Sequence, residues 1–270
     1  MVLQKTLASL VAASLLLASP AIATQPREPV VGERLADDAS AISIADESIA
    51  EAYRIWSSNG WKVLTNTSGI LNEAKPVSGV FSSANVDLTR ATAIVDAPAQ
   101  ALFDLLITPQ GFQLIDPLSN PEDFAKPPLQ TFSTTKWRTK SPADKKRLDS
   151  VRTEAPIPGL TTREFVVLNA VDSSTRIFVS KSVQHKADPG CSIYGPASCR
   201  GISSDPVRAL NTFAVSTEPV VGDANKCVVR LINYADLSAA EIPSSTMNQI
   251  NFNFLPEMVE RFRQHFATST

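Results

Sequence analysis

Residues 242–266 have the sequence IPSSTMNQINFNFLPEMVERFRQHF, in which apolar positions recur at steps of three and four residues. This apolar stripe consists of Met247, Ile250, Phe254, Leu255, Met258, Val259, Phe262 and Phe266. Polar residues fall largely opposite it: Glu257, Glu260, Arg261 and Gln264. The pattern predicts one long amphipathic helix, which packs either on an ordinary core or along an apolar cavity to which flexible Met side chains adapt.

The ends and the middle of this predicted helix carry three further signals. Ser244 and Ser245 are candidates to cap its start, because their hydroxyl groups can accept hydrogen bonds from the first turn. Pro256 removes a backbone donor and predicts a bend in the middle of the helix.

The first 23 residues have the organisation of a secretory signal peptide. Lys5 precedes an apolar run over residues 7–18, and Ala21-Ile22-Ala23 is a pattern that a signal peptidase cleaves. We therefore expect a signal peptide over residues 1–23, a flexible leader over 24–34 and one folded domain over 35–270, acting outside the cell. The net charge of −2 and the absence of a basic block give no electrostatic case for nucleic-acid binding.

Three cysteines fit a chain that enters an oxidising compartment. One disulfide and one remaining thiol is the simplest arrangement, and the Gly195-Pro196 turn favours Cys191 and Cys199 as the pair. Cys227 lies in an apolar strand pattern and is expected to be a buried thiol. The two histidines and the cysteines have no metal-ligand spacing, so we expect no metal and no cofactor.

The remaining chain alternates between helix and strand signals. Helical spacing over residues 33–58 predicts a long first helix, and a second helix is expected from Pro98 to about Thr108. Residues 110–128 are rich in Pro, Asp and Asn and are expected to form a loop. Strands are expected at residues 61–70, 77–81, 86–96, 129–139, 148–155, 163–171, 175–184, 207–216 and 227–234. This order predicts one α+β domain with a curved antiparallel sheet around the C-terminal helix.

Five motifs in this order resemble the START family, the lipid-transfer domains related to the steroidogenic acute regulatory protein. The similarity covers residues 35–266. The motifs are ATAIVDAPAQALFDLL at residues 91–106, Arg163-Glu164-Phe165-Val166, Ser182-Val183-Gln184-His185 with Val207-Arg208-Ala209, Ile242-Pro243, and Asn248-Gln249 before the last helix.

This resemblance implies a helix-grip fold, in which the sheet holds the C-terminal helix over a tunnel for one lipid. It implies a monomer that is not an enzyme, that binds one sterol or phospholipid and carries or sequesters it, and that touches membranes transiently to exchange it. The implied tunnel wall and lid consist of Ala93, Asn169, Arg230, Met247, Ile250, Asn251, Phe254 and Met258.

Two departures from the family pattern bear on the ligand. Glu164 stands where Asp is usual, and Asn169 stands where sterol-handling members tend to have an Arg of a buried ion pair. In the family pattern, the acidic partner of that Arg would correspond to Asp149. Because Asn169 carries no charge, the carboxylate of Asp149 must either face solvent or pair with another cation, such as Arg152 or Arg230. The assignment to sterols is weakened accordingly.

Two other functions stay open at this level. A helix-grip enzyme that acts on an apolar substrate needs only a buried acid and base, although the chain has no Gly-x-Ser-x-Gly, P-loop or dinucleotide motif. A secreted partner-binding protein would use the Cys191–Cys199 loop as its exposed element. The Asn66-Thr67-Ser68 sequon is a candidate glycosylation site in a eukaryotic secretory route.

Overall fold

The computed structural model describes residues 33–35, 38–78, 85–119, 130–131, 146–153, 162–185, 207–237 and 243–268. The expected signal peptide, most of the expected leader and the Cys191–Cys199 pair lie outside these residues. No helix in the described ranges is long and apolar enough to cross a membrane.

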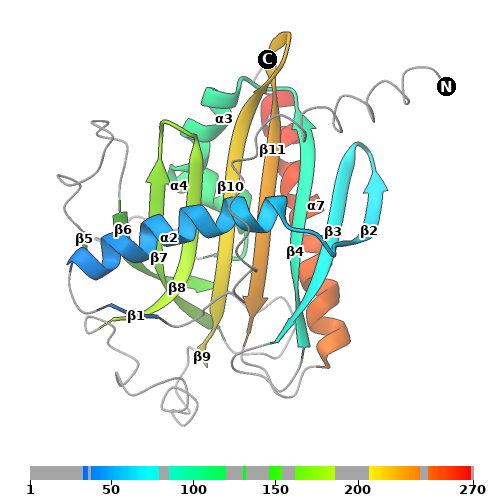
Figure 1. Cartoon of the computed structure of the whole chain (residues 1–270). Helices are drawn as coiled ribbons and strands as arrows, with labels where there is room; N and C mark the ends of the chain where they lie inside the picture. The colour runs from blue at the N-terminus through cyan, green and yellow to red at the C-terminus, as the bar shows by residue number, and fades with distance from the viewer. Residues whose placement is uncertain are drawn as a thin grey trace.

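One curved sheet organises the described part of the chain (Figure 1). Its strands follow one another in space as β2 (Lys62–Thr67), β3 (Ile70–Ser78), β4 (Asn85–Val95), β11 (Asp223–Asp236), β10 (Leu210–Val220), β8 (Ile177–His185), β7 (Arg163–Asp172), β6 (Lys146–Thr153) and β5 (Gln130–Thr131). All neighbours along this path are antiparallel. Two short strands join it in parallel, β1 (Glu33–Leu35) on β8 and β9 (Val207–Arg208) on β7. The predicted antiparallel sheet is confirmed.

Helices cover both faces of the sheet. In Figure 1, α2 (Asp38–Ser57) crosses the near face, and α3 (Ala99–Leu106), α4 (Pro109–Ile115) and α7 (Ser244–Ala267) lie behind it. Successive strand residues point to opposite faces, so Val229 and Leu231 pack in the core under α7, whereas Ile232 and Tyr234 pack under α2.

A buried ion pair fixes α2 to the sheet. Lys181 Nζ on β8 lies 2.9 Å from Glu51 Oε2 on α2, and both residues are buried. Two charges removed from water require such close pairing, because an unpaired buried charge is costly. The pair therefore helps to set the position of α2 along the sheet.

The C-terminal helix forms where its periodicity predicted it, but its start differs. Pro243 is the N-cap residue and makes no side-chain cap, while Ser244 and Ser245 lie inside the first turn. The predicted serine caps are therefore wrong. The carbonyl oxygen of Pro243 already accepts hydrogen bonds from Thr246 N and Met247 N, so the helix begins one residue before either serine could cap it.

The predicted loop at residues 110–128 is wrong at its beginning, where α4 forms. Thr108 Oγ1 accepts a 3.1 Å hydrogen bond from Gly111 N, and Pro109 occupies the first helical turn, where its missing donor costs nothing. A Cβ at Gly111 would lie 2.0 Å from the carbonyl oxygen of Leu105. The proline and the glycine that resembled loop signals thus start α4 and let it pack closely on the end of α3.

The N-terminal elements differ from prediction in two places. The predicted first helix begins only at Asp38, because Glu33–Leu35 pair with β8 as a strand. The predicted strand 61–70 is two strands, β2 and the start of β3, joined by a tight turn. Ser68 and Gly69 have φ values of 52° and 69°, the left-handed conformation that such two-residue hairpin turns require.

Candidate functional site

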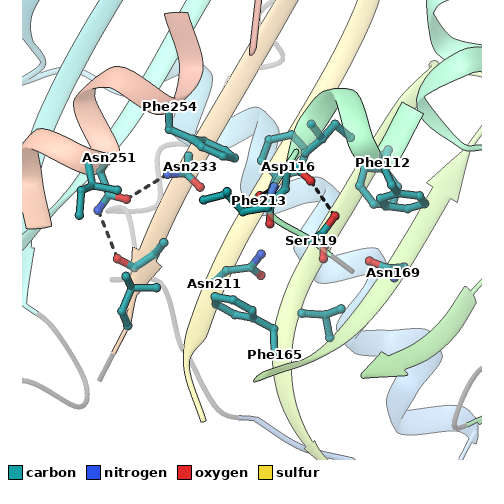
Figure 2. A pocket seen from close by; sticks show the side chains of 18 of the residues that line it. Phe112, Asp116, Ser119, Phe165, Asn169, Asn211, Phe213, Asn233, Asn251 and Phe254 are labelled. Carbon is teal, nitrogen blue, oxygen red and sulfur yellow. Dashed lines mark hydrogen bonds between the residues drawn. The ribbon is translucent and has the colours of Figure 1, made fainter. Parts of the chain in front are cut away.

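A cavity of about 170 Å³ lies between the concave face of the sheet, α4 and the first half of α7 (Figure 2). Strands β7, β8, β10 and β11 form its floor. Most of its surface is apolar and comes from Phe112, Ile115, Leu118, Phe165, Val167, Phe178, Phe213, Ala235, Leu237, Met247, Ile250 and Phe254. Such a concave apolar space with a few polar groups is the usual form of a small-molecule site.

Polar side chains cross the floor of this cavity in one band. Asn169 on β7 pairs in register with Ser180 on β8, which pairs with Phe213 on β10, which in turn pairs with Asn233 on β11. Asn211 lies two residues before Phe213 on the same face of β10. We call Asn169, Ser180, Asn211 and Asn233 the polar belt (Figure 2 labels all but Ser180).

The polar belt separates two hydrophobic clusters. Phe178, Val215 and Leu231 belong to the cluster on one side, under α3 and the second half of α7. Phe165, Val167, Leu237 and Met247 form the cluster on the other side. A ligand in the cavity would therefore meet hydrogen-bonding groups between two apolar regions.

Asn251 connects the belt to the C-terminal helix. Its Oδ1 accepts a 3.2 Å hydrogen bond from Asn233 Nδ2, and its Nδ2 donates a 3.2 Å hydrogen bond to the carbonyl oxygen of Ala235 (Figure 2). Asn211 differs, because its Oδ1 is buried and accepts no hydrogen bond from any described residue. An acceptor in this state is costly unless a ligand or water donates to it.

The rim of the cavity is formed where α4 ends. Asp116 Oδ1 accepts a hydrogen bond from Leu118 N, and Ser119 Oγ donates a 2.6 Å hydrogen bond to the carbonyl oxygen of Asp116 (Figure 2). Arg261 on α7 donates to the last carbonyl oxygens of α4, and its burial lowers the pKa of its guanidinium while the nearby carboxylates of Glu257 and Asp116 act to raise it. The rim is thus tied to the C-terminal helix.

Five of the eight residues predicted for the tunnel line this cavity. They are Met247, Ile250, Asn251 and Phe254 on α7, and Asn169 on β7. Their contact with a lipid stays a prediction.

The three other predicted residues lie elsewhere. Ala93 on β4 and Met258 on α7 lie on the same side of the sheet as the cavity. They do not line it, because they pack with Phe262 in the core between the sheet and the second half of α7. Arg230 lies next to Val229 and Leu231, so strand alternation turns it to the α2 face, where its Nη1 pairs with Glu218. Their placement in the tunnel wall is corrected accordingly.

The predicted pairing of Asp149 with position 169 does not occur in the register of β6 and β7. Asp149 pairs with Val167, and the residue opposite Asn169 on β6 is Arg147. The side chains of Asp149, Arg147 and Arg152 lie outside the described part of the structure.

Cys227 is a free buried thiol, as predicted. Burial, with a smaller contribution from the charge of Asp96, raises its pKa to about 12, so it is protonated at neutral pH. No cluster of three potential metal ligands occurs among the described residues.

No protein-family model and no curated protein matches the sequence. Among solved structures, human STARD10 superimposes with a TM-score of 0.51 and 17% identity, over 85% of this chain and 79% of that chain. The fold is a START-like helix grip. The Zhui aromatase/cyclase from Streptomyces sp. R1128 superimposes with a TM-score of 0.37 and 9% identity, over 66% of this chain and 88% of that one. DR_A0006 from Deinococcus radiodurans superimposes with a TM-score of 0.37 and 13% identity, over 68% of this chain and 99% of that one.

In this START-like helix grip, the cavity residues that sequence reasoning missed are on strands. Phe165 was predicted only as part of a family motif, and Phe178, Phe213, Asn211 and Asn233 only as residues of predicted strands, whereas all five line the cavity. Their signal was present: each asparagine is a polar residue at an inward position of an otherwise apolar strand. Such a residue needs a hydrogen-bond partner, and a cavity supplies room for one.

Proposed function

We propose that the chain binds one hydrophobic lipid, a sterol or a phospholipid, in the cavity under α7, and that it carries or sequesters this lipid outside the cell. The observation that supports the proposal is the apolar cavity between α7, α4 and the sheet, floored by Phe165, Phe178 and Phe213. The cavity lies where a helix grip encloses space, between its long helix and the concave face of its sheet.

The free energy of transfer favours such a site. A lipid that leaves a membrane exposes several hundred square ångströms of apolar surface, and each Å² of it costs about 25 cal/mol in water. Aromatic side chains on the floor and Met247, Ile250 and Phe254 on the helix would replace the contacts that the lipid loses. Polar residues of the belt would receive its polar end.

The size of the cavity indicates that uptake requires movement. Its volume of about 170 Å³ is below the roughly 300–1,000 Å³ that ligand sites usually occupy. We propose that α4 and the first half of α7 move apart from the sheet as the lipid enters. Transient contact with a membrane would supply and remove the lipid, and one monomer would hold one molecule.

We propose binding rather than catalysis. Asp116 is the one titratable side chain among the described residues that line the cavity, and it lies at the rim. General acid–base chemistry requires positioned groups that donate and accept protons within hydrogen-bond reach of a substrate. The described floor instead offers amides and hydroxyls, which bind without titrating near neutral pH.

The proposal is tested by native mass spectrometry of the protein expressed with its N-terminal segment, followed by organic extraction of what it carries. One lipid per monomer is the expected result. A protein that carries no lipid, and that takes up none from a panel of sterols and phospholipids, would contradict the proposed function.

A further inference from the structure

We infer that Asn72 is a positioning residue for the proposed ligand site, because its amide replaces the helical hydrogen bond that Pro256 cannot make. In this way β3, rather than the second half of α7, holds the half of the helix that lines the cavity. The inference deepens the proposed function and rests on it only for the effect on bound lipid.

Pro256 leaves one carbonyl group of α7 without its partner in the helix. In a regular helix the N–H of residue 256 would donate to the carbonyl oxygen of Phe252, but a proline has no N–H. A carbonyl group that is removed from water without a donor is costly. A proline inside a packed helix therefore needs a hydrogen-bond donor from outside the helix.

Asn72 supplies that donor from the sheet. Its Nδ2 donates a 2.8 Å hydrogen bond to the carbonyl oxygen of Phe252, and the residue is 1% exposed. Asn72 pairs in register with Ala91, which packs in the core under α7, so both side chains face the helix. With the amide reversed, two oxygen atoms would face each other, so the donor must point to the helix. The hydrogen bond to Phe252 accounts for a buried amide at this position.

The second half of α7 (residues 255–267) is held by the core and by an arginine. Its inward side chains are each 0% exposed and belong to one hydrophobic cluster: Leu255, Met258, Val259 and Phe262. Arg263 Nη2 donates a 2.9 Å hydrogen bond to the carbonyl oxygen of Ile94, and its Nη1 donates one of 2.8 Å to that of Ser68. This half therefore keeps its place without help from Asn72.

The first half of α7 (residues 244–254) is held to the sheet by amides. Asn251 binds β11 through Asn233, and Asn248 Oδ1 accepts a 2.8 Å hydrogen bond from Asp87 N on β4. Asn72 adds the contact with β3. Side chains of this half line a cavity, so they have less packing to hold them than the second half has. The amide hydrogen bonds are correspondingly more important for its position.

The position of the cavity wall follows from the bond that Asn72 makes. Phe254 lines the cavity and is two residues beyond Phe252 in the same turn of the helix. Because Pro256 interrupts the ladder of backbone hydrogen bonds after this turn, the second half of α7 fixes it less firmly than an unbroken helix would. Asn72 fixes the turn from the sheet instead. Loss of Asn72 should therefore loosen the cavity wall and leave the rest of the helix in place.

Amide hydrogen exchange, measured peptide by peptide, tests the inference without a ligand. Asn72→Leu removes the donor at a similar side-chain volume and should speed exchange about fivefold over residues 245–254, but less than about twofold over 257–267. Thr217→Val is the matched control. It removes an equally buried hydrogen bond, from Thr217 Oγ1 to the carbonyl oxygen of Ala99, and should not speed exchange selectively in the first half of α7. Equal acceleration of both halves in Asn72→Leu would overturn the inference.

Rescue by a second substitution separates positioning from general destabilisation. Pro256→Ala restores an N–H that can donate to the carbonyl oxygen of Phe252, so it should make Asn72 dispensable. In the Pro256→Ala background, Asn72→Leu should change exchange over residues 245–254 by less than about twofold. If Asn72→Leu alone does not fold, the double variant should fold. A double variant that is not rescued, in folding or in exchange, would overturn the inference.

Bound lipid is the readout that a merely structural role would not restore. Cholesterol and dioleoylphosphatidylcholine are delivered from cyclodextrin, and native mass spectrometry counts the molecules bound. Asn72→Leu should hold about fivefold less of the lipid that the parent protein binds, and the double variant should hold as much as Pro256→Ala. Full binding by Asn72→Leu would refute its positioning role. If the parent protein binds neither lipid, the proposed function is contradicted, whereas the exchange data still decide whether Asn72 replaces the missing helical bond.

Discussion

Arg261 Nε donates a 2.7 Å hydrogen bond to the carbonyl oxygen of Leu114, and its Nη2 donates one of 3.1 Å to the carbonyl oxygen of Ile115. These two carbonyl groups end α4 and have no partners within the helix, so the guanidinium satisfies them from α7. Phe112 and Ile115 of α4 line the cavity. The wall that α4 provides is thus fastened to the C-terminal helix.

Arg261→Met should loosen α4. The variant keeps the apolar stem but removes both hydrogen bonds, so we expect faster amide hydrogen exchange over residues 109–119 and a loss of about 1–3 kcal/mol in the free energy of unfolding. Arg263→Met is the control, because Arg263 donates to the carbonyl oxygens of Ile94 and Ser68 instead. Exchange in α4 that does not differ between the two variants would contradict this role of Arg261.

Gly111→Ala should destabilise the contact between α3 and α4. Its Cβ would lie 2.0 Å from the carbonyl oxygen of Leu105 and 2.7 Å from Leu106 Cα, so backbone must shift. We expect the free energy of unfolding in urea to fall by about 1–3 kcal/mol or more. Gly222→Ala is the comparison, because its φ of 84° adds strain while no atom lies within 4 Å. A larger loss in Gly222→Ala would refute the steric argument.

Met247→Trp should fill the cavity. Met247 lines it next to Ile250, and an indole is larger than a thioether side chain, so we expect bound lipid to fall at least severalfold with the fold retained. Val221→Trp places the same indole at a hairpin residue that is 88% exposed and should leave binding unchanged. Lipid content is measured by extraction from equal amounts of each protein. Full lipid content in a folded Met247→Trp variant would place the lipid elsewhere.

Cys227 should resist alkylation in the native protein. Burial raises its pKa to about 12, and the thiolate is the reactive form, so iodoacetamide at pH 8 should modify Cys227 only after unfolding in guanidinium chloride. Peptide mapping measures the modified fraction under both conditions. The same shift predicts that stability falls as pH rises above the unfolded-state pKa of about 8.5, because only the unfolded thiol then loses its proton. Burial also raises the pKa of Tyr53, so Cys227→Ala should show a smaller alkaline decline than the parent protein.

Asp172 should contribute pH-dependent stability to the turn between β7 and β8. Burial acts to raise the pKa of this carboxyl group, but hydrogen bonds from Ser174 and Thr175 outweigh burial and lower it. The contribution is therefore complete above the unfolded-state pKa of about 3.9 and is lost as pH falls through the lower folded-state pKa. Asp172→Ala should be less stable than the parent at pH 7, and the difference should shrink at pH 2. A difference that grows on acidification would contradict this assignment.

The elements that sequence reasoning predicted best are those with a strong internal period. Residues 244–267 form α7, close to the bounds that their apolar spacing predicted, and residues 85–95 form β4, close to the strand that their β-branched residues predicted. Residues 109–115 could not be predicted in this way, because Pro109 and Gly111 are loop residues by composition and helix residues by position. Only the close contact with α3, which leaves no room for a Cβ, explains why residue 111 is a glycine.

The site was predictable in part for a related reason. Met247 and Met258 lie on one apolar stripe of the C-terminal helix. The stripe does not indicate which half of the helix lines the cavity and which half packs in the core. Arg230 and Asn233 are three residues apart on one strand, so one faces α2 and the other the cavity. Which of them faces the cavity depends on register, which is fixed by pairing with strands far away in the sequence.

The pairing of β4 with β11 has a consequence for the synthesis of the chain. The middle of the sheet joins residues 89–95 to residues 227–233, so β4 has no neighbour on that side until most of the chain has been made. A sheet built from such distant segments forms slowly, and its unpaired edges are prone to aggregate meanwhile. Folding of the nascent chain should therefore wait for the ribosome to release β11 and α7, and chaperones that cover exposed strand edges should raise its yield.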